Sequence, residues 1–587
     1  LKGTPYILSG AVLIDCGNDI HIPAKASAIG ISRPGGMSFS GTVSELNVSN
    51  DILPRLLQEI IPERPELSRQ FTRLGAWQFN GQVDKTPEGL NADGLLYCEL
   101  GEIQGNVNMN ILPGRTEDIF TLNGELRTPG FEIGKFFAAE SLLGDVALDI
   151  KLNLNQQTRG GDLWGRVEGN IDHVDFKDYT YRNIILSGNY NNTNYDGILS
   201  INDPNGKLHL IGMIDLFDTH PMVRVFAEGQ DIRLGALNLA PQYAESTTSF
   251  NITSNFYGNH IDNIEGEIII DTLSFENEGR VFSTGQFAIS AENNDSIKRL
   301  HVNSDVINGG IEGNYSFKQL KEQFTELLSM YLPDLSVKAG TSHPKPEGNN
   351  FRYGFVVENS VELSSTLDLP ITLQEQVQIS GFFDGDNRRI GLHVYAPDLM
   401  FNTKHLFNNE ISIENSDSTV NLSLRTQTYN KKGQYTGLSF DTEAKDNLIL
   451  SRINWSNNSD TTFCGEISTS ARLYGRDSTI DCHIDVLPTR IIIGDSIWHI
   501  NPATITIADG KSRVKGIDIH HNGHYLHIDG EVSKNPADNL NLSLNDISLD
   551  YIFDALNPKN HFFGGPVPAN LALTHLAHGT TRPSNQP

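Results

Sequence analysis

Four histidines lie within eight residues of one another and are the first candidates for chemistry: His520, His521, His524 and His527. Imidazole nitrogens are common zinc ligands, but a zinc site needs several ligands that converge on one point. The stretch is typical of two strands joined by a turn at Asn522-Gly523. His521 and His524 then have opposite parity, so their side chains need not converge. No cysteine or carboxylate set completes a site, and the sequence predicts neither a metal ion nor a cofactor.

Acidic residues are plentiful, with 72 Asp and Glu in 587 residues, but no two of them stand out as a catalytic pair. They are scattered over the polar positions of alternating stretches, where a solvated surface is their ordinary role. No GxSxG, P-loop, GxGxxG or HExxH motif occurs in a supporting strand-to-helix context. The sequence therefore predicts a protein without enzymatic activity.

The cysteines are too few for a disulfide scaffold, and none has the CxxC spacing of a metal site. They are Cys16, Cys98, Cys464 and Cys482. Only Cys464 and Cys482 could meet, on neighbouring strands around a turn at Gly475. The alternative is that they are buried thiols, since free cysteine is among the most buried residue types.

The formal net charge of −28 and the pI near 5.0 argue against binding nucleic acid or an anionic bilayer surface. Both partners require clustered Lys and Arg to neutralise phosphates. No run reaches the 18 or more apolar residues of a membrane span, and we find no signal peptide. We expect the chain to be an internal or processed piece of a longer protein, whose anchoring segment lies elsewhere.

Alternation of apolar and polar residues in short runs is the dominant pattern of the chain, and residues 493–532 display it best. Gly, Asp and Asn separate the runs, which predicts half-buried strands joined by turns, a β-meander. The apolar parity changes from even to odd across Asn501-Pro502. A proline at such a point usually marks an edge, bulge or kink. We therefore expect the direction of the apolar face to change there, while the face itself continues.

The same alternation recurs elsewhere and predicts about 50 strands, at roughly 10 to 12 residues per strand and turn. One apolar face then runs along the sheet. We predict that it is lined by Val146, Leu148, Ile150, Leu152, Leu154, Leu208, Leu210, Ile214, Leu216, Trp498, Ile500, Ile505, Ile507, Leu540, Leu542 and Leu544.

The strongest predicted helix covers residues 317–333 and ends at Pro333. Its apolar stripe consists of Leu320, Phe324, Leu327, Leu328 and Tyr331, at helical spacing. One interpretation is that this stripe packs on the sheet, and the other is that it forms a lid over a groove. A shorter amphipathic helix is predicted within 51–63, where apolar residues again recur at helical spacing.

The sequence divides into five predicted segments: a first groove segment (1–316), the amphipathic helix (317–333), a polar linker (334–350), a second groove segment (351–563) and a poorly structured tail (564–587). With few helices to cover it, so long a sheet must either fold on itself as a sandwich or curl into a trough. Period-2 alternation is the same in both. Acyl chains or another β-rich polypeptide would suit an open trough, because neither needs polar partners at fixed positions.

Three segments, residues 181–216, 313–333 and 493–532, resemble the TamB-like translocation and assembly module proteins of Gram-negative envelopes, in the AsmA-like group. The similarity extends over roughly 75–560 and consists of patterns, without a catalytic motif. It implies a mainly β fold, with one long curled antiparallel sheet that forms an extended hydrophobic groove and a few short inserted helices. This plan is related to that of bridge-like lipid-transfer proteins.

The resemblance further implies a periplasmic protein that is anchored in the inner membrane. The family's membrane helix is missing from these residues, and its characteristic C-terminal domain cannot be identified in them. The implied partners are phospholipid acyl chains and an outer-membrane β-barrel assembly protein. The implied role is phospholipid transport to the outer membrane, or assembly of proteins in it. The alternative is a β-helical or adhesin-like surface protein that binds or acts on glycans, with a closed dry core and a polar cleft.

Overall fold

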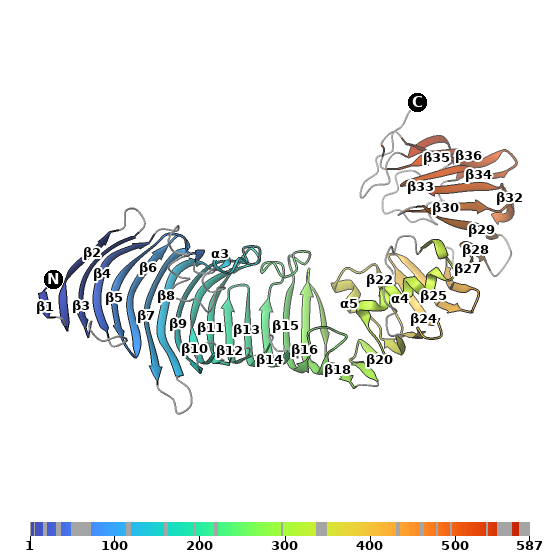
Figure 1. Ribbon diagram of the computed structural model, residues 1–587. Coiled ribbons are helices and arrows are strands. Elements are labelled where there is room, and N and C mark those ends of the chain that lie inside the picture. The colour runs from blue at the N-terminus through green and yellow to red at the C-terminus, as the bar shows by residue number, and fades with distance from the viewer. Residues whose placement is uncertain are drawn as a thin grey trace. The chain divides into compact units, whose positions relative to one another are not determined.

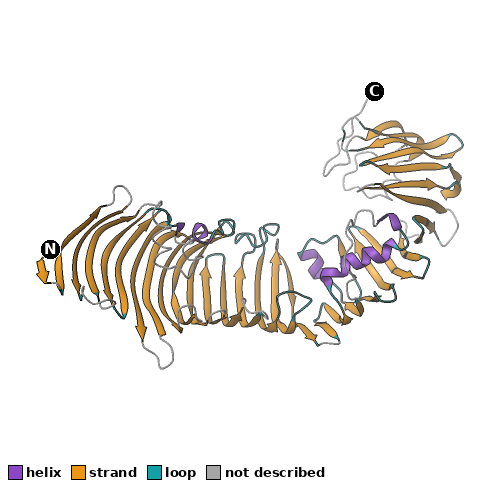
Figure 2. Ribbon diagram, viewed as in Figure 1, coloured by secondary structure: helices purple, strands orange, loops and turns teal. Residues whose placement is uncertain are grey.

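The computed structural model describes residues 2–4, 6–15, 20–30, 37–48, 72–112, 119–157, 163–191, 194–215, 221–294, 297–335, 349–429, 435–457, 463–476, 479–493, 496–533, 535, 538–548 and 566–573. Strands dominate these residues, and the helices are few and short (Figure 2). The strands belong to one large antiparallel sheet in which each pairs mainly with its neighbours in sequence. The predicted fold class is therefore confirmed.

The chain divides into two compact units, Leu1–Ile289 (unit 1) and Ser290–Pro587 (unit 2). The division falls inside strand β18 (Phe287–Asn293), whereas the sequence places the first segment boundary at residue 316. The sequence indicates a boundary at 316 because a predicted helix interrupts the alternating pattern there. The observed division inside β18 leaves no such mark, because the strands on both sides of it alternate in the same way.

Unit 1 is built almost entirely from strands of 9 to 15 residues that lie side by side in a row, as Figure 1 shows for β5 to β16. Its elements are β1 (Lys2–Thr4), β2 (Ile7–Asp15), β3 (Ile20–Ile29), β4 (Ser38–Val48), β5 (Trp77–Thr86), β6 (Gly89–Cys98), β7 (Gly101–Leu112), β8 (Ile119–Glu132), α3 (Ile133–Phe137), β9 (Leu143–Gln157), β10 (Leu163–Phe176), β11 (Tyr179–Asn191), β12 (Asn194–Asp203), β13 (Gly206–Asp215), β14 (Met222–Ile232), β15 (Thr247–Tyr257), β16 (Glu265–Asn277) and β17 (Arg280–Thr284).

Unit 2 combines the same kind of sheet with two further helices. After β18, its elements are β19 (Lys298–Asn303), β20 (Ile307–Asn314), α4 (Phe317–Ser329), β21 (Asn350–Val357), α5 (Val361–Thr366), β22 (Ile371–Leu373), β23 (Val377–Asp384), β24 (Arg389–Phe401), β25 (Lys404–Asn415), β26 (Val420–Tyr429), β27 (Tyr435–Lys445), β28 (Leu448–Ser456), β29 (Phe463–Arg476), β30 (Thr479–Val486), β31 (Thr489–Ile493), β32 (Ser496–Ile500), β33 (Ala503–Ala508), β34 (Lys511–His521), β35 (His524–Val532), β36 (Leu540–Ser548) and β37 (Pro566–Leu573).

The proline at 502 has the predicted effect on the sheet. It separates β32 from β33, and both short strands pair with the single long strand β34. Ile500 lies opposite Ile519, and Ile505 lies opposite Val514. The register of β34 against β35 shifts between Val514 and Ile517, so one extra residue in β34 restores the alternation. The apolar face continues across the break.

The tail predicted from 564 contains a strand. In β37, residues 566–573 pair with β36, with Leu571 opposite Leu542 and Ala569 opposite Leu544. The sequence PVPANLAL does alternate, but two prolines in its first three residues obscure the pattern, because proline is disfavoured inside strands. Most of the predicted linker (336–348), the predicted short helix at 51–63 and the residues from 574 onward lie outside the described residues.

Within the described residues, no helix has both the length and the apolar character that a membrane span requires.

Candidate functional site

Every strand of a sheet presents alternate side chains to opposite faces, and the register assigns the predicted lining residues of unit 1 to one of these faces. Leu152 of β9 lies opposite Val167 of β10, and Ile150 lies opposite Leu126 of β8. Farther along the sheet, Leu210 of β13 lies opposite Leu199. This face, which we call the apolar face, also carries Val146, Leu148, Leu154, Leu208 and Ile214. Leu216 lies outside the described residues.

The apolar face of unit 1 is not packed to the density of a core over most of its area. Leu148, Ile150, Leu152, Leu208 and Leu210 are all only half-buried. In a sandwich, a second sheet about 10 Å away would remove such side chains from water. The middle of this face is therefore accessible, and it is wide: a ten-residue strand such as β13 is about 33 Å long.

Glycines form one cross-strand row on the apolar face. Gly188, Gly197 and Gly212 lie opposite one another on β11, β12 and β13. A Cβ atom added at Gly188 would come within 2.5 Å of the ring of Tyr195, and one added at Gly212 would come within 2.1 Å of the backbone oxygen of Arg224. The Tyr195 ring therefore lies over the glycine row, and burial raises the pKa of its hydroxyl.

One end of the apolar face in unit 1 is covered by α3. Phe131 and Val146 are buried there with Leu74 and Leu100, and Ile133 and Phe136 pack against them. The Arg73 guanidinium donates a 2.9 Å hydrogen bond to the backbone oxygen of Phe136, which fixes the end of the helix. Figure 1 shows α3 at the ends of the strands and not over their middle.

A second cover follows β14, where residues 233–246 form consecutive turns. Leu237 is 4% exposed, and its backbone oxygen accepts a 3.1 Å hydrogen bond from the Tyr181 hydroxyl. Tyr243 packs edge-on against Phe275 of β16, with ring centroids 5.6 Å apart. Together with α3, these turns leave the central rows of the face uncovered.

The apolar face of unit 2 is occupied by α4. Leu327 and Tyr331 are buried in one cluster with Phe351, Phe383 and Ala444, which come from β21, β23 and β27. Leu320 and Phe324 pack against this cluster, whereas Leu328 lies beside it and is half-buried. Of the two interpretations of this helix, the packing of its stripe on the sheet is the one observed. The helix ends at Ser329, before Pro333.

Polar contacts fix α4 on this face. Tyr331 is 1% exposed. Its hydroxyl donates to the Ser416 backbone oxygen and accepts from the Asn415 amide, both at 2.6 Å. The backbone oxygen of Tyr331 accepts a 3.0 Å hydrogen bond from the Asn447 backbone. Buried Asn349 hydrogen-bonds Gln323 on the helix. Because these bonds tie Gln323 of the helix and Tyr331, just after its end, to segments next to β21, β25 and β27, α4 is an integral part of unit 2.

Beyond α4, the predicted lining residues of unit 2 also share one face. Trp498 lies opposite Ile491, Ile507 lies opposite Cys482, and Leu544 lies opposite Leu526. Leu540 and Leu542 follow on the same side of β36. Ile500 and Leu544 are buried, whereas Ile507 is 40% exposed. The face is thus closed in some places and open in others.

The parity argument for His521 and His524 does not describe their arrangement in the structure. His521 and His524 lie directly opposite each other across the turn, because the register pairs the last residue of β34 with the first of β35. Their rings stack with centroids 6.3 Å apart, next to Trp498. A hairpin with a two-residue turn puts its flanking residues on one face, and counting parity through the turn misses this. In the described part of the chain, no three His, Cys, Asp or Glu side chains are grouped so that they could hold a metal ion.

Cys464 and Cys482 do not form a disulfide with each other. Gly465 and Leu473 of β29 face the apolar side, so Cys464 points to the opposite side, while Cys482 lies opposite Leu473 on the apolar side. Burial raises the pKa of the Cys482 thiol.

The covers α3 and 233–246 each follow a strand that ends in an apolar-x-apolar step, Phe131-x-Ile133 and Ile232-x-Leu234. This step is the sequence signal that predicts short segments inserted as covers at the ends of the sheet. Comparison with known proteins found no matching family model and no matching curated protein.

Proposed function

We propose that the chain is a non-enzymatic carrier segment that holds phospholipid acyl chains on the apolar face of its sheet, as the resemblance to TamB-like proteins implies. The partly exposed apolar side chains of Ile150, Leu152 and Leu210 carry this proposal. Apolar surface costs about 25 cal/mol per Å² when it is left in water, and each buried methylene of an acyl chain recovers about 0.8 kcal/mol. An elongated apolar guest therefore fits this face better than a polar ligand does.

The dimensions of unit 1 agree with such a guest. The hydrocarbon of one bilayer leaflet is about 15 Å deep, half of a core of about 30 Å. The strands of the uncovered region are about twice that length. An acyl chain can lie on the face while its head group stays in water at a strand end. In this proposal the segment contributes a passive path, and transport toward the outer membrane, or assembly with a β-barrel partner there, follows from the family resemblance.

Two neighbouring residues of β13 provide a matched test. Leu210 lies on the apolar face, whereas Ile211 lies on the opposite face and is 43% exposed. Leu210→Asp places a charge against the bound chains and should reduce copurifying phospholipid by about tenfold or more, since a charge buried in hydrocarbon costs several kcal/mol. Ile211→Asp should leave lipid loading unchanged. The measurement is native mass spectrometry with lipid extraction on the full chain.

Tryptophan fluorescence checks the same proposal without changing the lining. Trp77 lies opposite Cys98 on the apolar face, and Trp164 lies on the other face of β10. In single-tryptophan variants loaded with phospholipid carrying brominated acyl chains, Trp77 should be quenched and Trp164 should not. Equal quenching of Trp77 and Trp164 would contradict the proposal. Phospholipid loading that Leu210→Asp leaves unchanged would also contradict it.

A further inference from the structure

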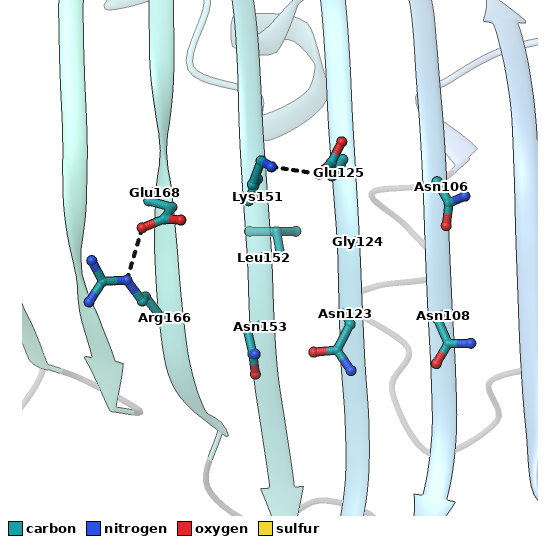
Figure 3. Close-up of a pocket in the computed structure, with 10 residues that line it drawn as sticks. All are labelled: Asn106, Asn108, Asn123, Gly124, Glu125, Lys151, Leu152, Asn153, Arg166 and Glu168. Carbon is teal, nitrogen blue, oxygen red and sulfur yellow. Dashed lines mark hydrogen bonds and ion pairs between the residues drawn. The ribbon is translucent and has the colours of Figure 1, made fainter.

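The face of unit 1 opposite the apolar face carries a regular array of polar side chains, which we call the polar face. Two adjacent cross-strand rows run over β7, β8, β9 and β10 (Figure 3). The first row is Asn106, Glu125, Lys151 and Glu168, and the second is Asn108, Asn123, Asn153 and Arg166. These eight residues line a shallow hollow of about 600 Å³.

The charges of this hollow are paired with each other, and two of its four amides are hydrogen-bonded to side chains outside it, Asn106 to Asp93 and Asn108 to Asn110. Lys151 lies 2.7 Å from Glu125, and Arg166 lies 2.9 Å from Glu168. The hydrogen bond that the Lys151 ammonium donates to Glu125 raises the pKa of Lys151. No dashed line in Figure 3 joins Asn123 or Asn153 to any of the other residues drawn. Asparagine is depleted in strands, so three of them in one row are not explained by the stability of the sheet.

An exposed aromatic side chain flanks the hollow. Trp164 lies two residues from Arg166 on the same face of β10, opposite Asn155 and Asn191, and is 41% exposed. A tryptophan in water on a polar sheet face offers a flat apolar surface with one donor at its edge. The charged side chains of the neighbouring hollow carry no net charge, since two are carboxylates and two are cations.

Unit 2 also has a hollow on the face opposite its apolar face, but no carboxylate or lysine is among the described residues that line it. It measures about 520 Å³, and its lining includes Arg425, Gln427, Asn454 and Tyr435. Amide side chains and one arginine thus line a hollow in each unit, at places where alternate residues of the same strands form the apolar face.

We propose that the polar face of β7 to β10, with Trp164 beside it, binds an extended uncharged glycan. Each sugar hydroxyl both donates and accepts hydrogen bonds, as a carboxamide does, and the apolar face of a pyranose ring can cover an indole. Strands repeat every 4.8 Å or so across the sheet, so a chain of sugars laid across them meets equivalent amides at successive strands. Balanced charges favour a neutral ligand.

The test uses the full chain with cellohexaose and chitohexaose as neutral probes, heparin as a polyanionic probe, and isothermal titration calorimetry as the readout. The double variant Asn123→Ala/Asn153→Ala and the single variant Trp164→Ala should each weaken binding of a neutral hexaose by about tenfold or more. Asn202→Ala is the matched control, because Asn202 is an exposed asparagine of β12 outside both hollows. It should bind like the unaltered chain.

Three results would overturn the inference: no binding of either neutral hexaose, binding that the amide and tryptophan variants leave unchanged, or binding of heparin alone. Because the site and the apolar face are on opposite sides of the sheet, the glycan result is independent of lipid loading. A lipid-free chain that still binds a hexaose would support the glycan site while contradicting the proposed lipid function.

Discussion

The two units cover their apolar faces in different ways although their strands follow the same pattern. In unit 1 the helix after β8 has 5 residues, and it buries side chains only at one end of the strands. In unit 2 the helix after β20 has 13 residues and buries Leu327 and Tyr331 among residues of several strands. Whether an alternating sheet presents an open or a filled face is therefore decided by the segments inserted between strands.

This difference has an energetic basis. A five-residue helix makes little more than one turn and presents one or two apolar side chains, whereas a 13-residue helix carries a stripe over three turns. Only the longer helix can replace water over several neighbouring strands. Unit 1 therefore keeps the accessible surface that the proposed lipid function requires, and unit 2 gains stability where α4 lies.

The largest expected effect is on unit 2. Tyr331→Ala removes a side chain that is 1% exposed together with its hydrogen bonds to Asn415 and Ser416, and should lower the free energy of unfolding of unit 2 by about 3–5 kcal/mol. Hydrogen exchange followed by mass spectrometry, read on peptides of β21 to β28, measures the loss, and peptides of unit 1 should not change. Met330→Ala is the control, because Met330 directly precedes Tyr331 at the end of α4 and is 38% exposed.

If Tyr331→Ala left unit 2 as protected as before, α4 would not be an integral part of that unit. The helix would then be a lid, and the contrast between the two units would disappear.

A smaller effect is expected at the covered end of unit 1. A Cβ atom at Gly134 would lie 1.8 Å from the backbone oxygen of Leu143, so Gly134→Ala must push α3 away from β9. We expect a loss of about 1–3 kcal/mol in the stability of this end, since overpacking in a tight contact costs that much. Exchange protection of β8 and β9 near Phe131 measures it.

Lys135→Ala is the matched control for Gly134→Ala, because Lys135 is an exposed residue of the same short helix whose ion pair with Glu132 is open to solvent. An equal loss in both variants would mean that α3 is held by its own helical contacts and not by docking on the sheet. Unit 2 should be unaffected by either change.

The sequence predicts the sheet well because alternation is local. The strands around Leu152, Leu210 and Ile500, and the re-aiming of the face at Pro502, all follow from period 2 and from the chemistry of proline. The division of the units inside β18 could not be predicted, because no change of composition marks it. The pairing of His521 with His524 was missed because it depends on the register of a turn and not on parity along the chain.

The candidate site could be predicted only in part, because the sequence indicates which side chains share a face of a strand but not what covers that face. Parity assigns Leu210 and Ile211 of one strand to opposite faces, but the accessibility of a face depends on what lies over it. The 13-residue helix could be recognised from its stripe, whereas α3 and the turns at 233–246 are too short to have a period. The hollow at Asn123 and Asn153 arises from cross-strand neighbours that are 30 residues apart in sequence, and only the register brings them together.

The contribution of the Tyr331 hydroxyl can be separated from that of its ring. Tyr331→Phe keeps the packing against Phe351 and Phe383 but leaves the Ser416 backbone oxygen and the Asn415 amide without this partner. We expect a loss of about 0.5–1.5 kcal/mol in unit 2. A loss as large as that of Tyr331→Ala would show that hydrogen bonds, and not the filling of the apolar face, hold α4 in unit 2.

The smallest effect concerns Cys482, which reports on the apolar face of unit 2 away from α4. Burial raises the pKa of this thiol from its ordinary value of 9.0. Since the pKa of the folded state is raised, the stability contributed by the neutral thiol is complete below the pKa of the unfolded state and is lost as the pH rises through the pKa of the folded state.

In a chain whose other cysteines are replaced by serine, iodoacetamide should modify Cys482 of the folded chain at pH 8 more slowly than it modifies Cys482 in urea, because the thiolate is the nucleophile. Equal rates would mean that this part of the face is as open as the middle of unit 1, so that only the region under α4 is filled.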